Sequence, residues 1–205
     1  MAVEIQQVYT ETPHKKQIKH AVDTLKQGGV IVYPTDTIYG LAADVYSKSA
    51  IDKIFKIKKV SQQKRLSLIF PDLKQISDWV KVPNSVFRIM RRVLPGKYTF
   101  ILPASKAVPK SLLKKRSTIG IRVPDNEVSR CLLEELGNPL ISSSVPNGAD
   151  DFQTDPDEIA ELFPYEIDLI LDAGVMPNRP STVVDFSVDP PEILREGDGD
   201  IDALF

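Results

Sequence analysis

Short apolar segments followed by proline alternate along this chain with longer amphipathic segments. Val30–Tyr33 and Thr118–Val123 have the length of buried strands, and a proline follows each of them directly. Lys16–Gln27 carries apolar residues at helical spacing and is followed by Gly28, a residue typical of helix ends. The alternation predicts helices packed on a sheet.

The same signals divide the rest of the chain. Asn84 and Asp155 are predicted to cap helices, and Pro156 suits the first helical position after Asp155. Further helices are expected over Ser49–Lys59, Ser85–Val93, Asn126–Leu136 and Pro156–Leu162. Further strands are expected over Arg65–Phe70, Tyr98–Leu102, Leu140–Ser143, Ile167–Leu171, Thr182–Phe186 and Glu192–Arg195. The last strands follow one another directly and no linker interrupts residues 1–205. We therefore predict one α/β (α+β) domain, a twisted open mixed sheet with flanking helices.

Composition narrows the cellular setting. The chain has 205 residues, of which 42% are hydrophobic, and no apolar run approaches the ~18 residues of a membrane span. The first residues show no signal peptide. Cys131 is the single cysteine, which excludes a disulfide framework and a cysteine-based zinc site. We expect a cytoplasmic protein with no membrane partner.

The net charge of −2 hides a strong asymmetry. Residues 53–116 carry 17 Lys and Arg against only Asp72 and Asp78, whereas residues 117–205 carry 4 Arg and 20 Asp and Glu. This division excludes a uniformly basic nucleic-acid coat and favours an anionic ligand near the middle segment. The alternative is that the basic helices form a solvated face.

Polar side chains directly follow the strand Val30–Tyr33. Thr35, Asp36 and Thr37 offer hydroxyls, a carboxylate and loop amides at the carboxyl end of a strand, where polar ligands often bind. The structural alternative is a proline-led turn in which Asp36 bonds nearby backbone.

Four lysines and an arginine surround the end of the next helix, between Lys56 and Arg65. Such a cluster could clamp phosphates. It could equally complement the helix dipole, because cations are stabilising at a helix C-terminus.

An arginine interrupts the apolar strand Thr118–Val123. Because side chains alternate along a strand, Thr118, Gly120 and Arg122 share one face. A guanidinium there needs a carboxylate or a phosphate. An ion pair with an acid from the C-terminal part of the chain is the structural alternative.

Serines and a further arginine lie at two other strand ends, but no nucleophile signature accompanies them. Ser142–Ser144 lack a G-x-S-x-G motif, and His14 and His20 both fall in the N-terminal segment. Arg195 closes the last predicted strand. No P-loop, G-x-G-x-x-G or H-E-x-x-H motif is present.

Six of these segments, in order over about residues 16–200, together resemble the YrdC-like family, which makes L-threonylcarbamoyladenylate from threonine, bicarbonate and ATP for tRNA modification. The segments are Tyr33-Pro34-Thr35-Asp36-Thr37 with Tyr39-Gly40-Leu41, Pro95-Gly96-Lys97-Tyr98-Thr99-Phe100, Ile121-Arg122-Val123-Pro124, Pro139-Leu140-Ile141-Ser142-Ser143-Ser144, Ser181-Thr182-Val183-Val184-Asp185 and Leu194-Arg195-Glu196-Gly197. Each segment alone is weak, but their order over nearly the whole chain is specific.

The resemblance implies a concave, basic cavity in which no protein nucleophile and no metal ligand is needed. It implies that Thr35, Arg122 and Ser181 hold threonine. It implies that the nucleotide and its phosphates face Lys58, Lys64, Thr118, Ser142, Ser144 and Arg195. ATP would be the substrate, with Mg²⁺ on its phosphates. The resemblance further implies double-stranded RNA or tRNA as a partner.

Two positions depart from the synthase motifs. Lys58-Lys59-Val60 replaces Lys-x-Arg, and Ser144-Val145-Pro146-Asn147 places the asparagine of Ser-x-Asn one residue late. With Asp36, these departures resemble the YciO-type branch of the family. Three functions stay open: a threonylcarbamoyl-AMP synthase or close relative, a nucleotide- or RNA-binding protein without the chemistry, and a structural or regulatory partner. Lys58 and Lys64 lie in the basic segment, residues 53–116. We therefore interpret the charge asymmetry as the sign of an anion-binding cavity.

Overall fold

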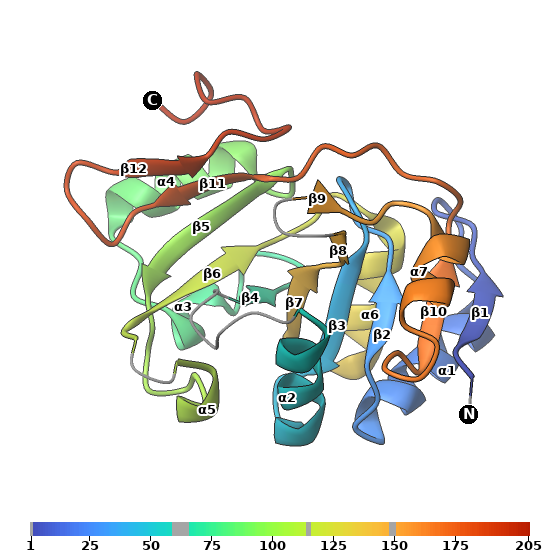
Figure 1. Cartoon of the computed structure of the whole chain (residues 1–205). Coiled ribbons are helices and arrows are strands. Elements are labelled where there is room, and N and C mark those ends of the chain that lie inside the picture. Colours follow the sequence, from blue (N-terminus) through green and yellow to red (C-terminus); the bar gives the residue numbers. More distant parts are fainter. Residues whose placement is uncertain (1, 59–65, 114–115, 148–150) are drawn as a thin grey trace.

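A mixed, twisted sheet organises the chain (Figure 1). The computed structural model describes residues 2–58, 66–113, 116–147 and 151–205. The strands of this sheet are β1 (Glu4–Gln7), β2 (Ile31–Tyr33), β3 (Gly40–Asp44), β4 (Ser67–Ile69), β5 (Tyr98–Pro103), β6 (Thr118–Arg122), β7 (Leu140–Ser144), β10 (Leu169–Asp172), β11 (Thr182–Asp185) and β12 (Glu192–Arg195). Their order is β1-β10-β2-β3-β7-β4-β6-β5-β11-β12. The predicted fold class is confirmed.

Both pairing directions occur, which makes the sheet mixed. β1 and β10, β10 and β2, β4 and β6, and β5 and β11 pair in parallel. The other neighbours are antiparallel. A separate short hairpin, β8 (Pro146–Asn147) with β9 (Asp151–Phe152), lies outside this sheet.

Helices cover the sheet from both sides. They are α1 (Lys15–Lys26), α2 (Lys48–Ile57), α3 (Ile76–Trp79), α4 (Asn84–Val93), α5 (Lys110–Leu113), α6 (Glu127–Leu136) and α7 (Pro156–Leu162). One buried cluster joins α1 and α6 to one face of β2, β3, β7 and β10, through residues such as Leu25 and Leu132. A second cluster joins α2, α3 and α4 to the opposite face, through residues such as Ile54, Ile76 and Met90.

Strand alternation explains why part of the first face stays open. Leu68, Phe100 and Ile121 point into the core with α3 and α4. Their neighbours along the strands are smaller or polar: Ser67 lies opposite Gly120, and both line a cavity. Since α1 and α6 cover only the other end of this face, the sheet is hollowed over β4, β5, β6 and β11.

Most element boundaries agree with the predictions to within two residues, but some elements were missed. β3 is a fully paired central strand between β2 and β7, although its sequence, Gly-Leu-Ala-Ala-Asp, is poor in β-formers. β1 was missed as well; it is an edge strand with mostly exposed side chains.

The two predicted helix caps have different outcomes. The side chain of Asp155 accepts a hydrogen bond from the backbone of Asp157, and Pro156 starts α7, as predicted. Asn84 is wrong as a cap, because α4 begins at Asn84 itself with Pro83 before it and no side-chain cap. A proline that fixes the extended entry replaces the cap there. Within the described ranges, no helix combines the length and apolar character that crossing a membrane requires.

Candidate functional site

A cavity of about 800 Å³ lies on the open part of the sheet face. Its floor is made by alternate residues of three adjacent strands, Ser67 and Ile69 on β4, Gly120 and Arg122 on β6, and Thr99 and Ile101 on β5. Its rim comes from strand ends and loops: Thr35, Ile38, Tyr39, Gly40, Lys58, Ser142, Ser143, Ser144, Asp151, Phe152, Asn178, Pro180, Ser181, Val183, Leu194 and Arg195. The volume is in the range of small-molecule sites.

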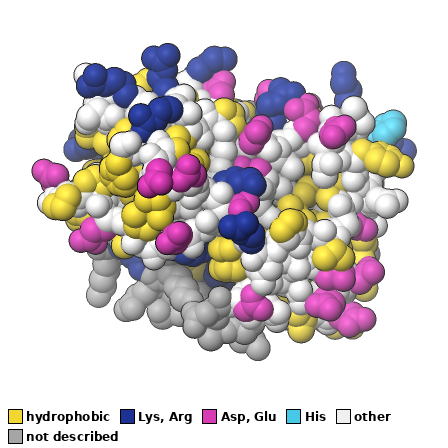
Figure 2. All heavy atoms as spheres, turned by 90° about the horizontal axis from the view of Figure 1, so that it is seen from above, with side chains coloured by type: hydrophobic (Ala, Val, Ile, Leu, Met, Phe, Trp, Pro, Cys, Tyr) yellow, Lys and Arg dark blue, Asp and Glu magenta, His cyan; other side chains and the backbone are white. Residues whose placement is uncertain are grey.

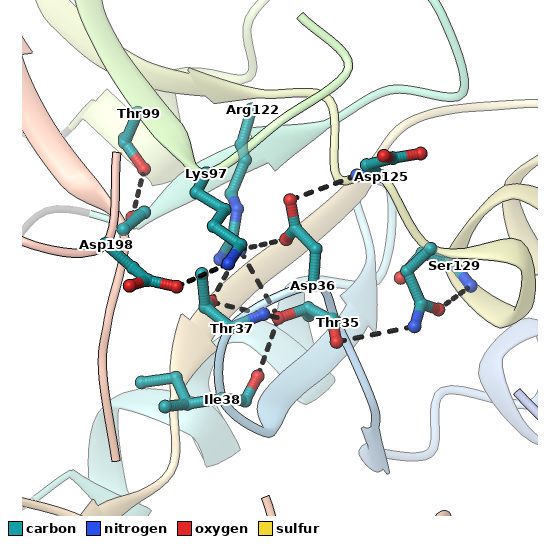
Figure 3. A network of polar contacts seen from close by, with 12 residues as sticks. Thr35, Asp36, Thr37, Ile38, Lys97, Thr99, Arg122, Asp125, Ser129 and Asp198 are labelled. Carbon is teal, nitrogen blue, oxygen red and sulfur yellow. Dashed lines mark hydrogen bonds and ion pairs between the residues drawn. The ribbon is translucent and has the colours of Figure 1, made fainter. Parts of the chain in front are cut away.

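Arg122 is held by the loop that follows β2 (Figure 3). Its Nη2 donates to Asp36 Oδ1 at 2.5 Å, to Thr37 Oγ1 at 2.6 Å and to Thr35 Oγ1 at 3.3 Å. The side chains of Arg122 and Asp36 are only 11% and 5% exposed. This is a buried ion pair, in which either partner left alone would be an uncompensated charge.

Asp36 does not bond nearby backbone, so the local-turn interpretation of this residue is wrong. Its second oxygen accepts the backbone N–H of Asp125 at 3.1 Å, 89 residues along the chain. The other predicted alternative, a bond from Arg122 to a C-terminal acid, is wrong too. The local bonds of this loop come from Thr35 instead, which accepts from the backbone of Thr37, donates to the carbonyl of Ile38 and shares a hydrogen bond with the Thr37 hydroxyl. Asp36 therefore ties the β2 loop to the end of β6.

The guanidinium of Arg122 keeps unused donors. Every hydrogen bond that it makes to the described residues leaves from Nη2. Nε is buried and has no partner among those residues. Asp36 thus neutralises the charge of Arg122 and fixes the guanidinium through Nη2. Nη1 stays available to an incoming acceptor.

Arg195 lies in the same cavity but lacks an acidic partner in the described ranges. Its Nε and Nη2 donate to the carbonyl of Ser181 at 3.0 and 2.8 Å, and Nη2 also reaches Ser181 Oγ at 3.2 Å. Burial lowers the pKa of Arg195, and repulsion from Arg122 adds to the effect. Because a guanidinium stays protonated in proteins, this cation is a desolvated charge that favours an anionic ligand.

Lys58 extends the positive charge to the serine strand. Its Nζ donates to Ser143 Oγ at 2.5 Å and to the carbonyl of Ser144 at 3.3 Å. It follows the last residue of α2, but its side chain reaches across to β7, so it does more than complement the helix dipole. Ser142 accepts from the buried hydroxyl of Tyr33 at 3.1 Å.

The structure brings most of the predicted site residues together. Those that line the one cavity are Thr35, Lys58, Arg122, Ser142, Ser144, Ser181 and Arg195. Thr118 does not line it; it begins β6 opposite Pro103, two residues further from the cavity than Gly120. Lys64 and Val60 lie outside the described residues. Whether these side chains bind threonine and a nucleotide stays a prediction.

Asn147, the displaced asparagine of the Ser-x-Asn motif, does not line the cavity. It is exposed on β8, and its side-chain amide points to Asp151 at 3.4 Å. Phe152 of the same hairpin faces the cavity instead.

Several cavity residues escaped the sequence predictions. Thr99 shares a 2.8 Å hydrogen bond with Ser181, which joins β5 to the residue whose carbonyl accepts from Arg195. Asn178 donates to Asp151 at 2.6 Å at another edge of the cavity. Thr99 was predictable, because it lies in one of the six segments that carry the family resemblance and side chains alternate along β5. Phe152 and Asn178 were not predictable, because the residues around them form no recognisable pattern.

Among the described residues, the cavity accounts for only part of the charge asymmetry. Of the described Lys and Arg residues between positions 53 and 116, only Lys58 lines the cavity. Arg88, Arg91 and Arg92 lie exposed on α4. Figure 2 shows Lys and Arg side chains beside Asp and Glu across one face rather than one continuous basic field. For these residues the solvated-face alternative is correct. Among the described residues, the positive charge in the cavity comes from Lys58, Arg122 and Arg195.

A second cavity, of about 510 Å³, is lined by acids. Asp36, Asp125, Asp198 and Asp200 lie around it, and Lys97 bonds Asp198 at 2.5 Å (Figure 3). The described residues nevertheless contain no group of three or more His, Cys, Asp or Glu side chains that could hold a metal ion.

Gly197 makes room for the backbone that carries Ser181. A Cβ at Gly197 would lie 2.2 Å from the carbonyl oxygen of Pro180 and 2.5 Å from the carbonyl carbon of Ser181. Its N–H donates to Thr182 Oγ1 at 3.0 Å. We expect Gly197→Ala to lower the free energy of unfolding by about 1–3 kcal/mol, because backbone rather than a flexible side chain must move.

Urea unfolding measures this effect, with Gly174→Ala as the matched control. Gly174 has φ +82° but no atom within 4 Å of an added Cβ, so its replacement costs only backbone strain. Equal losses at the two positions would contradict the packing argument.

Comparison with known proteins identifies the family. The family model named for Sua5, YciO and YrdC and described as "Telomere recombination" matches residues 23–197. The chain is 39% identical to the uncharacterized protein YciO of Escherichia coli over 95% of each chain. Its structure matches the crystal structure of E. coli YciO with a TM-score of 0.94, covering 99% of this chain and 100% of that one.

Two more distant relatives are known by an activity or by a bound ligand. The chain is 34% identical to a threonylcarbamoyl-AMP synthase of Coxiella burnetii, over 89% of this chain and 98% of that protein. It also matches P. abyssi Sua5, solved in complex with L-threonine, with 28% identity and a TM-score of 0.87. That match covers 94% of this chain but 57% of Sua5. On the family match and on these relatives, the chain belongs to the Sua5/YciO/YrdC family.

Proposed function

We propose that the chain joins L-threonine, carbon dioxide or bicarbonate, and ATP into threonylcarbamoyl-AMP and diphosphate. The observation that carries this proposal is the pair of differently treated arginines in one cavity. Arg122 is neutralised by Asp36 yet keeps donors free, which suits an amino-acid carboxylate. Arg195 is desolvated without an acidic partner in the described ranges, which suits a phosphate.

The threonine end is formed by Arg122, Thr35 and Ser181. Nη1 of Arg122 would receive the carboxylate, and the Ser181 hydroxyl would bond the amino group or the side-chain hydroxyl. The Thr35 hydroxyl, which already bonds Ile38, Thr37 and Arg122, would act by holding Arg122 in place. That P. abyssi Sua5 was solved with L-threonine, at 28% identity, supports this assignment.

The chemistry needs positioning and charge stabilisation rather than a protein nucleophile. The neutral threonine amine attacks the carbon of CO₂, which bicarbonate supplies by losing hydroxide. An N–C bond forms, one C=O π pair moves to oxygen, and the nitrogen proton passes to water, to give a carbamate. A carbamate oxygen then attacks the α-phosphorus of ATP, and the bond to the β-phosphate oxygen breaks to release diphosphate. Lys58 and Arg195 would stabilise the charge on the phosphates. Mg²⁺ would enter with the phosphates, because it binds substrate phosphates and keeps several waters.

The test is a steady-state assay of diphosphate release with purified protein, ATP, Mg²⁺, bicarbonate and L-threonine. We expect release that requires all three substrates and that disappears when threonine or bicarbonate is omitted. Release no faster than in a protein-free control would overturn the proposal.

The second candidate is a nucleotide- or double-stranded-RNA-binding protein without synthase activity. The position of Asn147 favours it, because this residue is exposed on β8 and outside the cavity. Absence of turnover together with tight RNA binding that weakens steeply with salt would establish this candidate.

The position of Val60 gives a further prediction. By the family resemblance, Val60 stands where synthases carry an arginine of the phosphate clamp. We expect Val60→Arg to raise ATP affinity about 10- to 100-fold, since a charge-assisted hydrogen bond contributes roughly 1.5–3 kcal/mol. Titration calorimetry with ATP measures it, and Val60→Met controls for side-chain length. If neither affinity nor activity changes, the alignment of the clamp is wrong.

A further inference from the structure

An aromatic ring lies in the wall of the cavity, on the hairpin β8–β9. Phe152 lines the cavity and is partly buried, in a strand pair of only two residues each. The guanidinium carbon of Arg195 lies 5.6 Å from the centre of its ring. That distance is within the range of a cation–π contact, so the ring and the arginine form one platform.

Arg195 and Phe152 offer a ligand different contacts: hydrogen bonds from the edge of the guanidinium and apolar surface on the face of the ring. Arg195 uses its Nε and Nη2 edge on Ser181 and leaves Nη1 for a phosphate. Phe152 has no hydrogen-bonding group, so what it offers to a ligand in the cavity is apolar aromatic surface. Such a surface suits the flat π-system of a nucleobase.

The distribution of charge fixes the orientation of a nucleotide on this platform. Asp151, next to Phe152, is the one carboxylate among the described lining residues, and Asn178 bonds it at 2.6 Å. Asp151 would repel the outer phosphates of a nucleotide, and Lys58, near Ser143 and Ser144, would attract them. Arg195, whose guanidinium lies beside the Phe152 ring, would contact the phosphate nearest to the nucleoside. The neutral base would therefore lie at the Asp151–Phe152 end.

We propose that Phe152 is the nucleobase-binding residue of the cavity, on which the base of ATP stacks. This inference rests on the proposed function, because it assumes that a nucleotide occupies the cavity. It assigns β9 a role in holding the base, in a chain whose displaced motif asparagine, Asn147, does not line the cavity.

The experiment compares the binding of ATP with that of inorganic tripolyphosphate, which has the charge but no base. Titration calorimetry is carried out on the wild-type chain, Phe152→Ala, Phe152→Leu and Phe152→Tyr. We expect Phe152→Ala and Phe152→Leu to weaken ATP binding about 5- to 150-fold, the range for loss of base–aromatic stacking, and to leave tripolyphosphate affinity within twofold. Phe152→Tyr should bind ATP like the wild type. Tyr165→Ala, which removes a ring that is 79% exposed and outside the cavity, is the control.

Each other outcome has a distinct meaning. Parallel losses for both ligands would show that Phe152 only supports the hairpin, and unchanged ATP affinity would show that the ring contacts no base; either result overturns the inference while the proposed function stands. If the wild-type chain binds neither ligand, the proposed function fails and the inference fails with it.

Discussion

Replacing Arg122 by alanine is expected to abolish threonine-dependent activity and also to destabilise the protein by about 3–5 kcal/mol. The second effect follows from burial: Asp36 is only 5% exposed, and without Arg122 its carboxylate becomes an unpaired charge in the protein interior. Removing one partner of a buried pair is far more costly than removing both. Urea unfolding measures the stability, and calorimetry with L-threonine measures the affinity.

A double variant separates the two roles of Arg122. In Arg122→Met with Asp36→Asn, no charge is left unpaired, and the asparagine amide oxygen can still accept from the N–H of Asp125. We expect most of the stability to return while threonine binding stays lost. If threonine affinity returned along with stability, Arg122 would not hold the substrate carboxylate.

Replacing Arg195 by alanine is expected to weaken ligand binding strongly while changing stability little. ATP affinity should fall about 10- to 150-fold, the equivalent of one charge-assisted hydrogen bond. The free energy of unfolding should change by no more than about 1 kcal/mol, since the lost bonds to Ser181 are offset by removal of a desolvated cation. Calorimetry with ATP and urea unfolding give the two values.

Arg195→Lys is the matched variant, because it keeps the charge without the planar fork. We expect intermediate ATP affinity and weaker binding at higher salt. A large loss of stability in Arg195→Ala, with ATP affinity unchanged, would contradict the assignment of this arginine to an anionic ligand.

The contrast between the two arginines could not be obtained from the sequence. The alternation of β6 correctly predicted that Arg122 shares a face with Gly120, because side-chain direction along a strand is a local property. Its partner was not predictable, because Asp36 lies 86 residues away and meets it only after β2 and β6 take their places in the sheet. From charge alone, an acid of the C-terminal part was the structural alternative to a ligand.

In the fold as well, features set by neighbouring residues were predictable, and features set by distant strand pairing were not. The cap at Asp155 and the end of α6 at Leu136 follow from residue chemistry within one turn, and both are as predicted. β3 was missed because its Gly and Ala residues have little β-propensity, and its pairing with β2 and β7 supplies what its sequence lacks. Phe152 was missed because nothing in the segment around it is periodic.

Isotope-labelled bicarbonate gives the most direct test of the central claim, that this cavity joins threonine to a nucleotide through a carboxyl group. The purified chain is incubated with ATP, Mg²⁺, L-threonine and ¹³C-bicarbonate, and the adenylate products are separated and weighed by mass spectrometry. The account predicts a threonylcarbamoyl adenylate that carries the heavy carbon, is absent without threonine, and is lost in both Arg122→Met with Asp36→Asn and Arg195→Ala. An adenylate without the heavy carbon, or no adenylate from a chain that binds both ATP and threonine, would contradict it.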